Sequence, residues 1–291
     1  MELRELKYFL AVAREESISK AALSLFVTQP NLSRQMQNLE KEAGQQLFIR
    51  GSRKITLTEA GRLLRKRAEE IIDLYEKTAS ELKSPITDLS GDIYIGGGES
   101  YVMGLIAKAA HNVRAEYPNI KYHLFSGDSA TISERLDKGL IDFGIFIEPF
   151  DVSKYDYLRL PLTDTWGVLM RKDSPLAGKD FITPEDLWDK PLIRSRQSIG
   201  KNIVSEWFKK NSEELNIVAT GNLLYNMSLL VEEGIGYAVS LDKIINTSGE
   251  SNLCFRPLYP KLESHLNIAW KKGQVFSKCA ETFLHRLREL L

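Results

Sequence analysis

The hydrophobic pattern of this chain changes at residues 83–90, and this change constrains the fold more than any other feature of the sequence. Before it, apolar residues recur at helical spacing. After it, short aliphatic runs alternate with helical segments of ten or more residues, which is the pattern of a parallel α/β sheet. The segment between holds Pro85 among small polar residues, as linkers do. The chain of 291 residues is therefore predicted to contain at least two modules of different class.

Charge is distributed unequally between these modules. Residues 1–67 contain 13 Lys/Arg and 7 Asp/Glu, a balance of +6, and since the whole chain has 39 of each, residues 68–291 balance at −6. A basic end on an acidic remainder is typical of a modular DNA binder, because Lys and Arg neutralise phosphates. The apolar stretches are far shorter than the ~20 residues that cross a bilayer, and the first residues do not begin a signal peptide. We therefore expect a cytoplasmic protein with no membrane partner.

The sequence predicts no cofactor and no metal site. Cys254 and Cys279 lack CxxC spacing, so we interpret them as reduced structural thiols, with a redox role as the alternative. The histidines are scattered along the chain, at His111, His123, His265 and His285.

Three short helices are predicted at the N-terminus. The first begins at Leu3, the second covers residues 20–25 with Ser19 as its N-cap, and the third runs from Thr28 to about residue 43 before Gly44. Its outer face is polar and nearly free of acids. A short tri-helical unit with a donor-rich third helix is typical of the helix-turn-helix, whose last helix lies in the major groove. The alternative is that these polar positions are merely solvated.

A hairpin and a long helix are expected next. Residues 47–50 and 54–57 are expected to pair as a small wing with basic residues near its tip. Residues 59–84 are predicted to form a linker helix whose apolar stripe, close to a heptad, pairs with the same helix of a second subunit. The alternative is packing on its own domain. The stripe comprises Leu64, Ala68, Ile71, Tyr75, Ala79 and Leu82.

These residues resemble a known family. SISKAALSLFVTQPNLS at residues 17–33, followed by Leu39-Glu40, Gly44, residues 47–50 and LTEAG at residues 57–61, is similar to the N-terminal signature of LysR-type transcriptional regulators. The chain departs from that signature at Asn31, where a small apolar residue is usual, and at Ala43, where a larger aliphatic is usual. The resemblance implies a winged helix-turn-helix over residues 1–58, a dimer through the linker helix, and DNA reading by the third helix. The expected DNA-binding residues are Thr28, Gln29, Pro30, Ser33, Arg34, Gln37, Arg50, Arg53 and Lys54.

Residues 85–90 are expected to form a hinge linker, and an α/β domain follows. Strands are predicted at residues 92–96, 121–125 and 142–147 in a first lobe, and at 166–170, 192–195, 217–219 and 236–240 in a second. Lobe I should cover residues 91–161 and 266–291, and lobe II residues 162–265. This resembles the type-2 periplasmic-binding-protein fold that the family uses for its effector. The fold class is thus an N-terminal all-α winged helix-turn-helix with a long linker helix, then a two-lobed α/β effector-binding domain.

The effector site is expected between the lobes, because ligands of open α/β sheets lie beyond the carboxyl ends of strands. For Ser100 the resemblance implies a hydrogen bond to a bound carboxylate, with a helix cap as the alternative. Acidic and basic residues together suggest a zwitterionic or amine-bearing carboxylate. The expected effector-binding residues are Glu99, Ser100, Tyr101, Gly127, Asp128, Glu148, Trp166, Arg194, Ser195, Arg196, Gln197 and Tyr225.

The partners expected are double-stranded promoter DNA and a small-molecule effector, with RNA polymerase as a further candidate. By resemblance, dimers associate into homotetramers. An enzyme is the main rival, but residues 98–102 lack the last Gly of G-x-S-x-G, and Gly96-Gly97-Gly98 lacks the Lys-Ser/Thr of a phosphate loop. The sequence also leaves open a solute-binding protein and an architectural DNA protein without ligand response.

Overall fold

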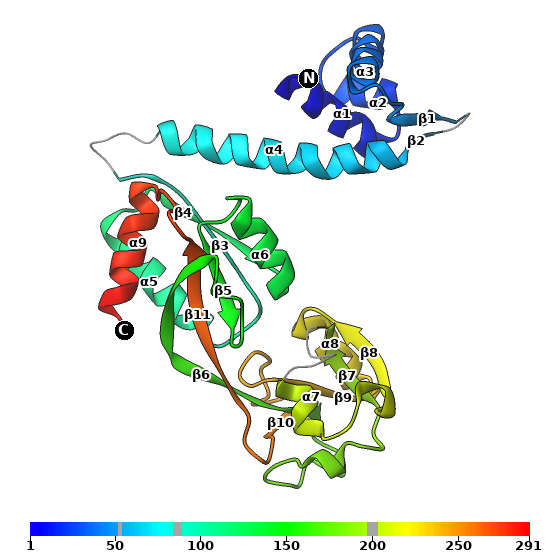
Figure 1. Ribbon diagram of the computed structural model, residues 1–291. Helices are drawn as coiled ribbons and strands as arrows, with labels where there is room; N and C mark the ends of the chain where they lie inside the picture. Colours follow the sequence, from blue (N-terminus) through cyan, green and yellow to red (C-terminus); the bar gives the residue numbers. More distant parts are fainter. Residues whose placement is uncertain (52–53, 84–88, 197–202) are drawn as a thin grey trace. The chain divides into compact units, whose positions relative to one another are not determined.

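A computed structural model describes residues 1–51, 54–83, 89–196 and 203–291, which form two compact units, Met1–Lys83 and Ser84–Leu291 (Figure 1). No helix in these described ranges is long and apolar enough to span a bilayer. Each unit has its own hydrophobic core.

Unit 1 is a three-helix bundle with a hairpin and a long helix. Its elements are α1 (Leu3–Glu15), α2 (Ile18–Ser24), α3 (Gln29–Ala43), β1 (Phe48–Arg50), β2 (Ile55–Leu57) and α4 (Glu59–Lys83). The core forms where one face of each helix meets the others, around Phe9, Leu32 and Leu39. The expectation of a cap at Ser19 is wrong: Ser17 is the N-cap of α2 and its side chain accepts from the Lys20 N–H, so the helix begins two residues earlier.

The family-like signature of unit 1 has a physical basis. Glu40 on α3 accepts hydrogen bonds from the backbone N–H groups of Leu47 (2.8 Å) and Phe48 (3.0 Å), which holds the wing against the helix. Thr58 Oγ1 accepts from the Gly61 N–H at 3.0 Å and caps α4. At Gly61 a Cβ atom would lie 2.1 Å from the Leu47 carbonyl oxygen, so only glycine fits there. These contacts fix the wing to the beginning of α4.

Unit 2 is a nine-stranded sheet with helices on both faces. In chain order its elements are β3 (Gly91–Gly97), α5 (Met103–Glu116), β4 (Ile120–Ser126), α6 (Ser129–Asp137), β5 (Phe143–Ile147), β6 (Tyr155–Arg171), the 3-10 helix η1 (Pro184–Asp186), β7 (Leu192–Ser195), α7 (Ile203–Phe208), the 3-10 helix η3 (Ser212–Glu214), β8 (Ile217–Gly221), α8 (Leu224–Glu232), β9 (Tyr237–Leu241), β10 (Leu253–Pro257), β11 (Glu263–Lys271) and α9 (Lys278–Glu289). The strand order is β4-β3-β5-β11-β6-β9-β7-β8, with β10 also paired to β6.

The sheet belongs to two lobes that share two strands. In lobe I, β3, β4 and β5 are parallel, and in lobe II β7, β8 and β9 are parallel. β6 and β11 pair antiparallel and run through both lobes (Figure 1). The strand expected at residues 166–170 is only the end of a longer one, because β6 is continuous over 17 residues, Tyr155–Arg171. α5 and α9 pack on one face of lobe I, and α6 packs on the other.

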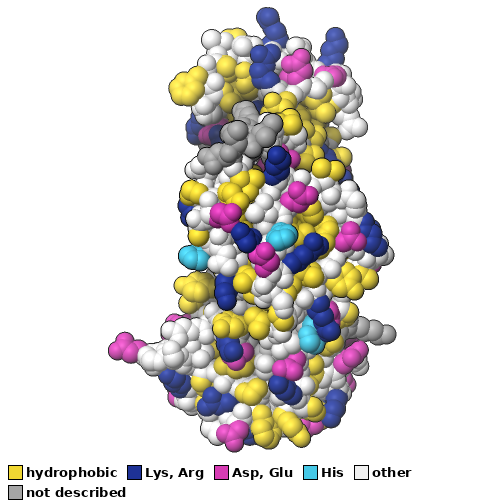
Figure 2. Space-filling model, turned by 90° about the vertical axis from the view of Figure 1, so that its left-hand side faces the viewer, with side chains coloured by type: hydrophobic (Ala, Val, Ile, Leu, Met, Phe, Trp, Pro, Cys, Tyr) yellow, Lys and Arg dark blue, Asp and Glu magenta, His cyan; other side chains and the backbone are white. Residues whose placement is uncertain are grey.

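Both signs of charge are present on the face of the molecule shown in Figure 2. On the face shown in Figure 2, Lys/Arg and Asp/Glu side chains are interspersed over unit 2 rather than gathered by sign.

Cys254 and Cys279 are buried and unbridged, and burial raises the pKa of both thiols. Because the thiolate is the reactive form, the structure favours the interpretation of these residues as structural.

Candidate functional sites: the third helix and the cleft between the lobes

The outer face of α3 is open to solvent. Thr28 is its N-cap without a side-chain cap bond, Pro30 lies in the first turn, and the first turn has no acidic residue. An accessible N-terminus with its unsatisfied N–H groups favours an anion such as a phosphate. Of the α3 residues expected to meet DNA, Ser33 is half-buried and the others are exposed, namely Gln29, Pro30, Arg34 and Gln37.

The structure describes only part of the expected basic wing. Arg53 lies outside the described residues, and Arg50 is placed only as a backbone position in β1. Lys54 Nζ lies 3.3 Å from Glu16 Oε2, with both side chains more than half exposed. An exposed pair of this kind stabilises weakly, about 0–1 kcal/mol, so Lys54 can exchange Glu16 for a phosphate at little cost.

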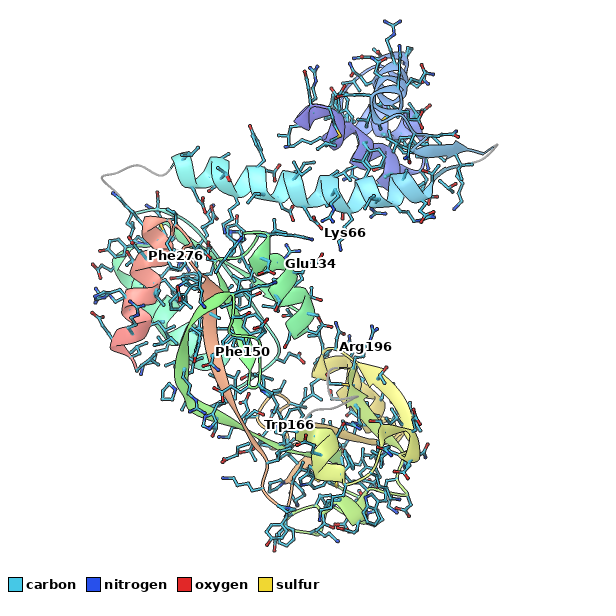
Figure 3. The ribbon with its side chains drawn as sticks, viewed as in Figure 1. Lys66, Glu134, Phe150, Trp166, Arg196 and Phe276 are labelled. Carbon is cyan, nitrogen blue, oxygen red and sulfur yellow. The ribbon has the colours of Figure 1, made fainter. Side chains whose placement is uncertain are left out.

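A cleft of about 650 Å³ lies between the two lobes of unit 2. Lobe I lines it with the loops after β3, β4 and β5, and lobe II with the loop after β7, the beginning of α8 and the end of β9. Trp166 lines it from the crossing strand β6, and Arg196 from the loop after β7 (Figure 3). The residues of lobe I are Gly98, Glu99, Asp128, Ser129, Ala130, Ile147, Glu148 and Pro149, and those of lobe II are Ser195, Arg196, Ile203, Val204, Asn222, Leu224, Met227, Val239, Ser240, Leu241 and Ile244.

The cleft brings together half of the residues that the sequence selected. Those that line it are Glu99, Asp128, Glu148, Trp166, Ser195 and Arg196. Gln197 lies outside the described residues. The remaining five are not among the described lining residues, and they are Ser100, Tyr101, Gly127, Arg194 and Tyr225.

Arg194 is displaced from the expected position by the pleat of β7. Side chains alternate along a strand, so Arg194 and Ser195 point to opposite faces. Ser195 lines the cleft, whereas Arg194 is fully buried, donates to Ser205 Oγ at 3.2 Å and lies 5.0 Å from the Phe208 ring centroid. Burial lowers the pKa of Arg194 to about 10. The expectation was that Arg194 adds positive charge to the cleft. In the structure its side chain instead packs against α7 and is not among the described lining residues.

Ser100 and Tyr101 contact the crossing strand β6 instead. Ser100 Oγ accepts from the Val102 N–H at 2.9 Å, and both Ser100 and the Tyr101 backbone hydrogen-bond to the carboxyl group of Asp164 on β6. The Tyr101 ring lies 4.7 Å from Lys243 Nζ of lobe II. Burial raises the pKa of Asp164. These residues therefore join the beginning of α5 to the crossing strand.

Gly127 and Tyr225 make hydrogen bonds through their backbone groups. The Gly127 N–H donates to the Gly97 carbonyl at 3.1 Å, linking the ends of β3 and β4. Tyr225 is 63% exposed, and its carbonyl oxygen accepts from Ser228 Oγ within α8. Among the described lining residues of the cleft, α8 contributes Leu224 and Met227 and not Tyr225.

Two of the three acidic side chains of the cleft, Glu148 and Asp128, are held in place by hydrogen bonds within lobe I or from β6 and β11. Glu148 Oε1 accepts from Asn267 Nδ2 at 2.9 Å, and its Oε2 pairs with Arg159 at 3.1 Å. Asp128 is the N-cap of α6, and its hydrogen bonds from the Thr131 hydroxyl and N–H, with the nearby charge of Arg196, lower its pKa. Asp128 therefore stays ionised and attracts Arg196 across the cleft.

The sequence reasoning missed two kinds of lining residue. The apolar wall of Val204, Met227 and Leu241 carries no sequence signal of its own, because apolar residues beside a cleft follow the same periodicity as core residues. Ser240, in contrast, ends a predicted strand, so the carboxyl-end rule that selected Ser195 also selects it. Around the cleft and elsewhere in the described ranges, no three His, Cys, Asp or Glu residues are grouped to hold a metal ion.

Comparison with known families supports both units. Residues 3–62 match the model of the bacterial regulatory helix-turn-helix protein of the lysR family, and residues 87–291 match the LysR substrate binding domain. The chain belongs to the LysR family. Its fold class is thereby confirmed, as a helix-turn-helix followed by an α/β substrate-binding domain.

Relatives of this LysR-family chain are transcriptional regulators. It is 30% identical over 281 residues to the Hca operon transcriptional activator HcaR of Escherichia coli, covering 94% of this chain and 93% of HcaR. Full-length BenM is 29% identical, with a TM-score of 0.54 over 100% of this chain and 96% of BenM. CbnR in complex with its target DNA has the same fold, with a TM-score of 0.79 at 20% identity over 100% of both chains. HcaR is named as a transcriptional activator and CbnR as a LysR family transcriptional regulator, and neither name describes an enzyme.

Proposed function

We propose that this LysR-family regulator reads a promoter sequence with α3 and responds to a small molecule bound in the cleft of unit 2. The cleft carries the proposal, because it is lined from both lobes and its volume of about 650 Å³ lies within the ~300–1,000 Å³ of small-molecule sites. A ligand that contacts both lobes has different affinities for their open and closed arrangements, which is the requirement for a ligand to shift that equilibrium.

The DNA-binding surface is the exposed face of α3 with the wing beside it. Arg34 can make a bidentate contact with guanine and Gln29 or Gln37 with adenine, while Lys54 meets the backbone. The structure of CbnR with its target DNA supports double-stranded DNA as the partner. The proposed contacts are Thr28, Gln29, Pro30, Ser33, Arg34, Gln37, Arg50, Arg53 and Lys54. Since DNA is the target, the protein acts in the cytoplasm.

The subunits pair through α4. Beyond Ala68, which is buried in unit 1, its apolar residues Ile71, Leu74, Tyr75 and Leu82 are exposed. An amphipathic helix with an exposed apolar stripe pairs favourably with a second copy of itself. Two recognition helices in such a dimer address two half-sites about one DNA turn apart. Two dimers then form a tetramer, and RNA polymerase is the partner that this assembly recruits or blocks.

The effector is a small carboxylate that also bears an amine. Three of the charged side chains lining the cleft are acidic, Glu99, Asp128 and Glu148, against the single described cation Arg196. An ammonium group compensates this negative charge, and the positive charge of Arg196 attracts a carboxylate to the cleft. Trp166 and the apolar wall contact the rest of the ligand. Thermal-shift titration of the full chain with amino acids and with simple dicarboxylates tests this proposal. A response to dicarboxylates alone contradicts the proposal that the effector bears an amine.

The function is tested by footprinting the full chain on the DNA flanking its own gene, with and without those compounds. We expect protection of a dyad-symmetric site whose extent changes with one compound. Protection without symmetry and without response to any compound would instead indicate an architectural DNA protein. Absence of protection at low salt would contradict the assignment of α3 as the recognition helix.

A further inference from the structure

Helix α8 takes its N-terminal hydrogen-bond partner from the other lobe. Its N-cap residue is Leu223, which has no side-chain oxygen and makes no cap bond. The N–H of Leu224, the first residue of α8, donates to Glu99 Oε2 of lobe I, and both residues line the cleft. A carboxylate at a helix N-terminus is favoured by the free N–H groups and by the helix dipole. Glu99 therefore acts as an anion bound to lobe II.

A second polar group stands at the same edge of the sheet without a partner. Ser240 lines the cleft, is 6% exposed, and its Oγ has no hydrogen-bond partner among the described residues. β7 pairs in parallel with β9 at Arg194 and Val239 and with β8 at Ser195 and Gly221. Ser240, Ser195 and Gly221 thus lie at the carboxyl ends of three adjacent strands, and α8 begins three residues after Gly221. A buried hydroxyl without a partner is uncommon and marks a position where a ligand oxygen gains a donor.

We infer that the beginning of α8 and Ser240 form an anion subsite, that Glu99 fills it as a built-in carboxylate, and that the carboxylate of an effector binds by displacing Glu99. This inference rests on the proposed function only in assuming that a small molecule enters the cleft. The exchange replaces one carboxylate by another at the same N–H, and the ligand carboxylate additionally accepts from Ser240. Displacement also breaks the hydrogen bond by which Glu99 joins lobe I to lobe II, so ligand entry and the arrangement of the lobes are coupled.

Glu99 is attached to the chain beside its binding site, and this attachment determines how strongly it competes with a free carboxylate. A side chain held beside its site acts at an effective concentration on the order of millimolar. A free carboxylate must therefore reach a comparable concentration before it replaces Glu99. Removal of the Glu99 carboxylate should strengthen the binding of a small carboxylate by about tenfold or more.

The test uses acetate, which reproduces the group removed in Glu99→Ala. The Tm of the full chain is measured against acetate concentration at constant ionic strength, with acetamide as the neutral isostere. We expect acetate to raise the Tm of Glu99→Ala at about tenfold lower concentration than that of the wild type, and acetamide to have no effect on either. Glu185→Ala is the matched control, because Glu185 is an exposed glutamate of lobe II outside the cleft and its loss changes the net charge equally.

Each result decides the inference. Equal acetate responses in the wild type, Glu99→Ala and Glu185→Ala would overturn it. If the double variant Glu99→Ala/Ser240→Ala loses most of the stronger acetate response of Glu99→Ala, the result supports a subsite formed by α8 and Ser240. If the stronger response is unchanged, Ser240 is not part of the subsite. If Glu99→Ala does not fold, Glu99→Gln keeps the shape of the side chain without its charge, and succinate should then compete better than in the wild type. An acetate gain without any ligand effect on the footprint refutes the proposed function while leaving the subsite in place.

Discussion

Replacement of Arg34 by alanine tests the recognition surface most directly. Arg34 lies on the exposed face of α3, two residues after Leu32 and two before Met36, both of which are buried. Because Arg34 is exposed, Arg34→Ala should change the free energy of unfolding by no more than about 0.5 kcal/mol. A lost bidentate contact to a base should cost about 1–3 kcal/mol of binding free energy, which is about 5- to 150-fold in Kd.

The assay is fluorescence anisotropy on the footprinted site and on single-base variants of it, at several salt concentrations. We expect Arg34→Ala to weaken binding to the cognate site and to reduce discrimination at one base pair. Lys41→Ala is the control, because Lys41 lies in the last turn of the same helix and its loss changes the charge equally. At a rise of 1.5 Å per residue, Lys41 is about 10 Å further along the axis, away from the N-terminal residues that contact bases.

Two results would contradict this reasoning. Uniform weakening on every DNA, with a salt slope reduced by about 0.9, would place Arg34 on a phosphate instead of a base. Wild-type affinity in Arg34→Ala on all sequences would remove Arg34 from the interface.

Three further substitutions test the fold of both units. Phe26→Gly should stabilise the chain by about 1 kcal/mol, measured as a rise in Tm. Phe26 has φ 55° and is 97% exposed, so relief of its left-handed strain loses no buried contact. Gly61→Ala should destabilise unit 1 by about 3 kcal/mol or more in urea unfolding, since its Cβ would lie 2.1 Å from the Leu47 carbonyl oxygen, and wild-type stability would refute this packing. Burial raises the pKa of Asp164, so stability should fall as pH rises from its ordinary value through the raised one, and this fall should vanish in Asp164→Asn. An identical pH profile in Asp164→Asn would contradict the assignment.

Much of the fold follows from periodicity in the sequence, and the errors have definite causes. The predicted strand at residues 166–170 covers only the end of β6, because Asp164 interrupts the aliphatic residues before it, yet this carboxyl group is buried where Ser100 and the Tyr101 backbone hydrogen-bond to it. A polar partner from a distant segment cannot be identified by local pattern. β10 was missed because its Leu253–Pro257 run has no alternation, and it is a strand only through its pairing with β6.

The sequence predicts the position of the candidate cleft more accurately than it predicts which side chains line it. The carboxyl-end rule finds the end of a strand, as at Ser195, but the pleat decides which of two neighbouring side chains faces the ligand. Arg194 was misplaced for that reason. The hydrogen bond between Glu99 and Leu224 depends on how the lobes approach each other. Sequence reasoning that treats each lobe separately does not predict such a contact.

The lobes are joined by a ribbon of two strands, not by two loops. β6 and β11 pair from Tyr155 opposite Lys271 to Thr165 opposite Glu263, with a register shift only between His265 and Asn267. Backbone hydrogen bonds keep such strands at a fixed spacing, whereas a two-stranded ribbon twists readily. Twisting of this ribbon is therefore one motion that changes the relative orientation of the lobes. A ligand in the cleft that favours one twist changes the torsion angle between the lobes. The free energy available for that change equals the difference between the free energies of ligand binding at the two angles.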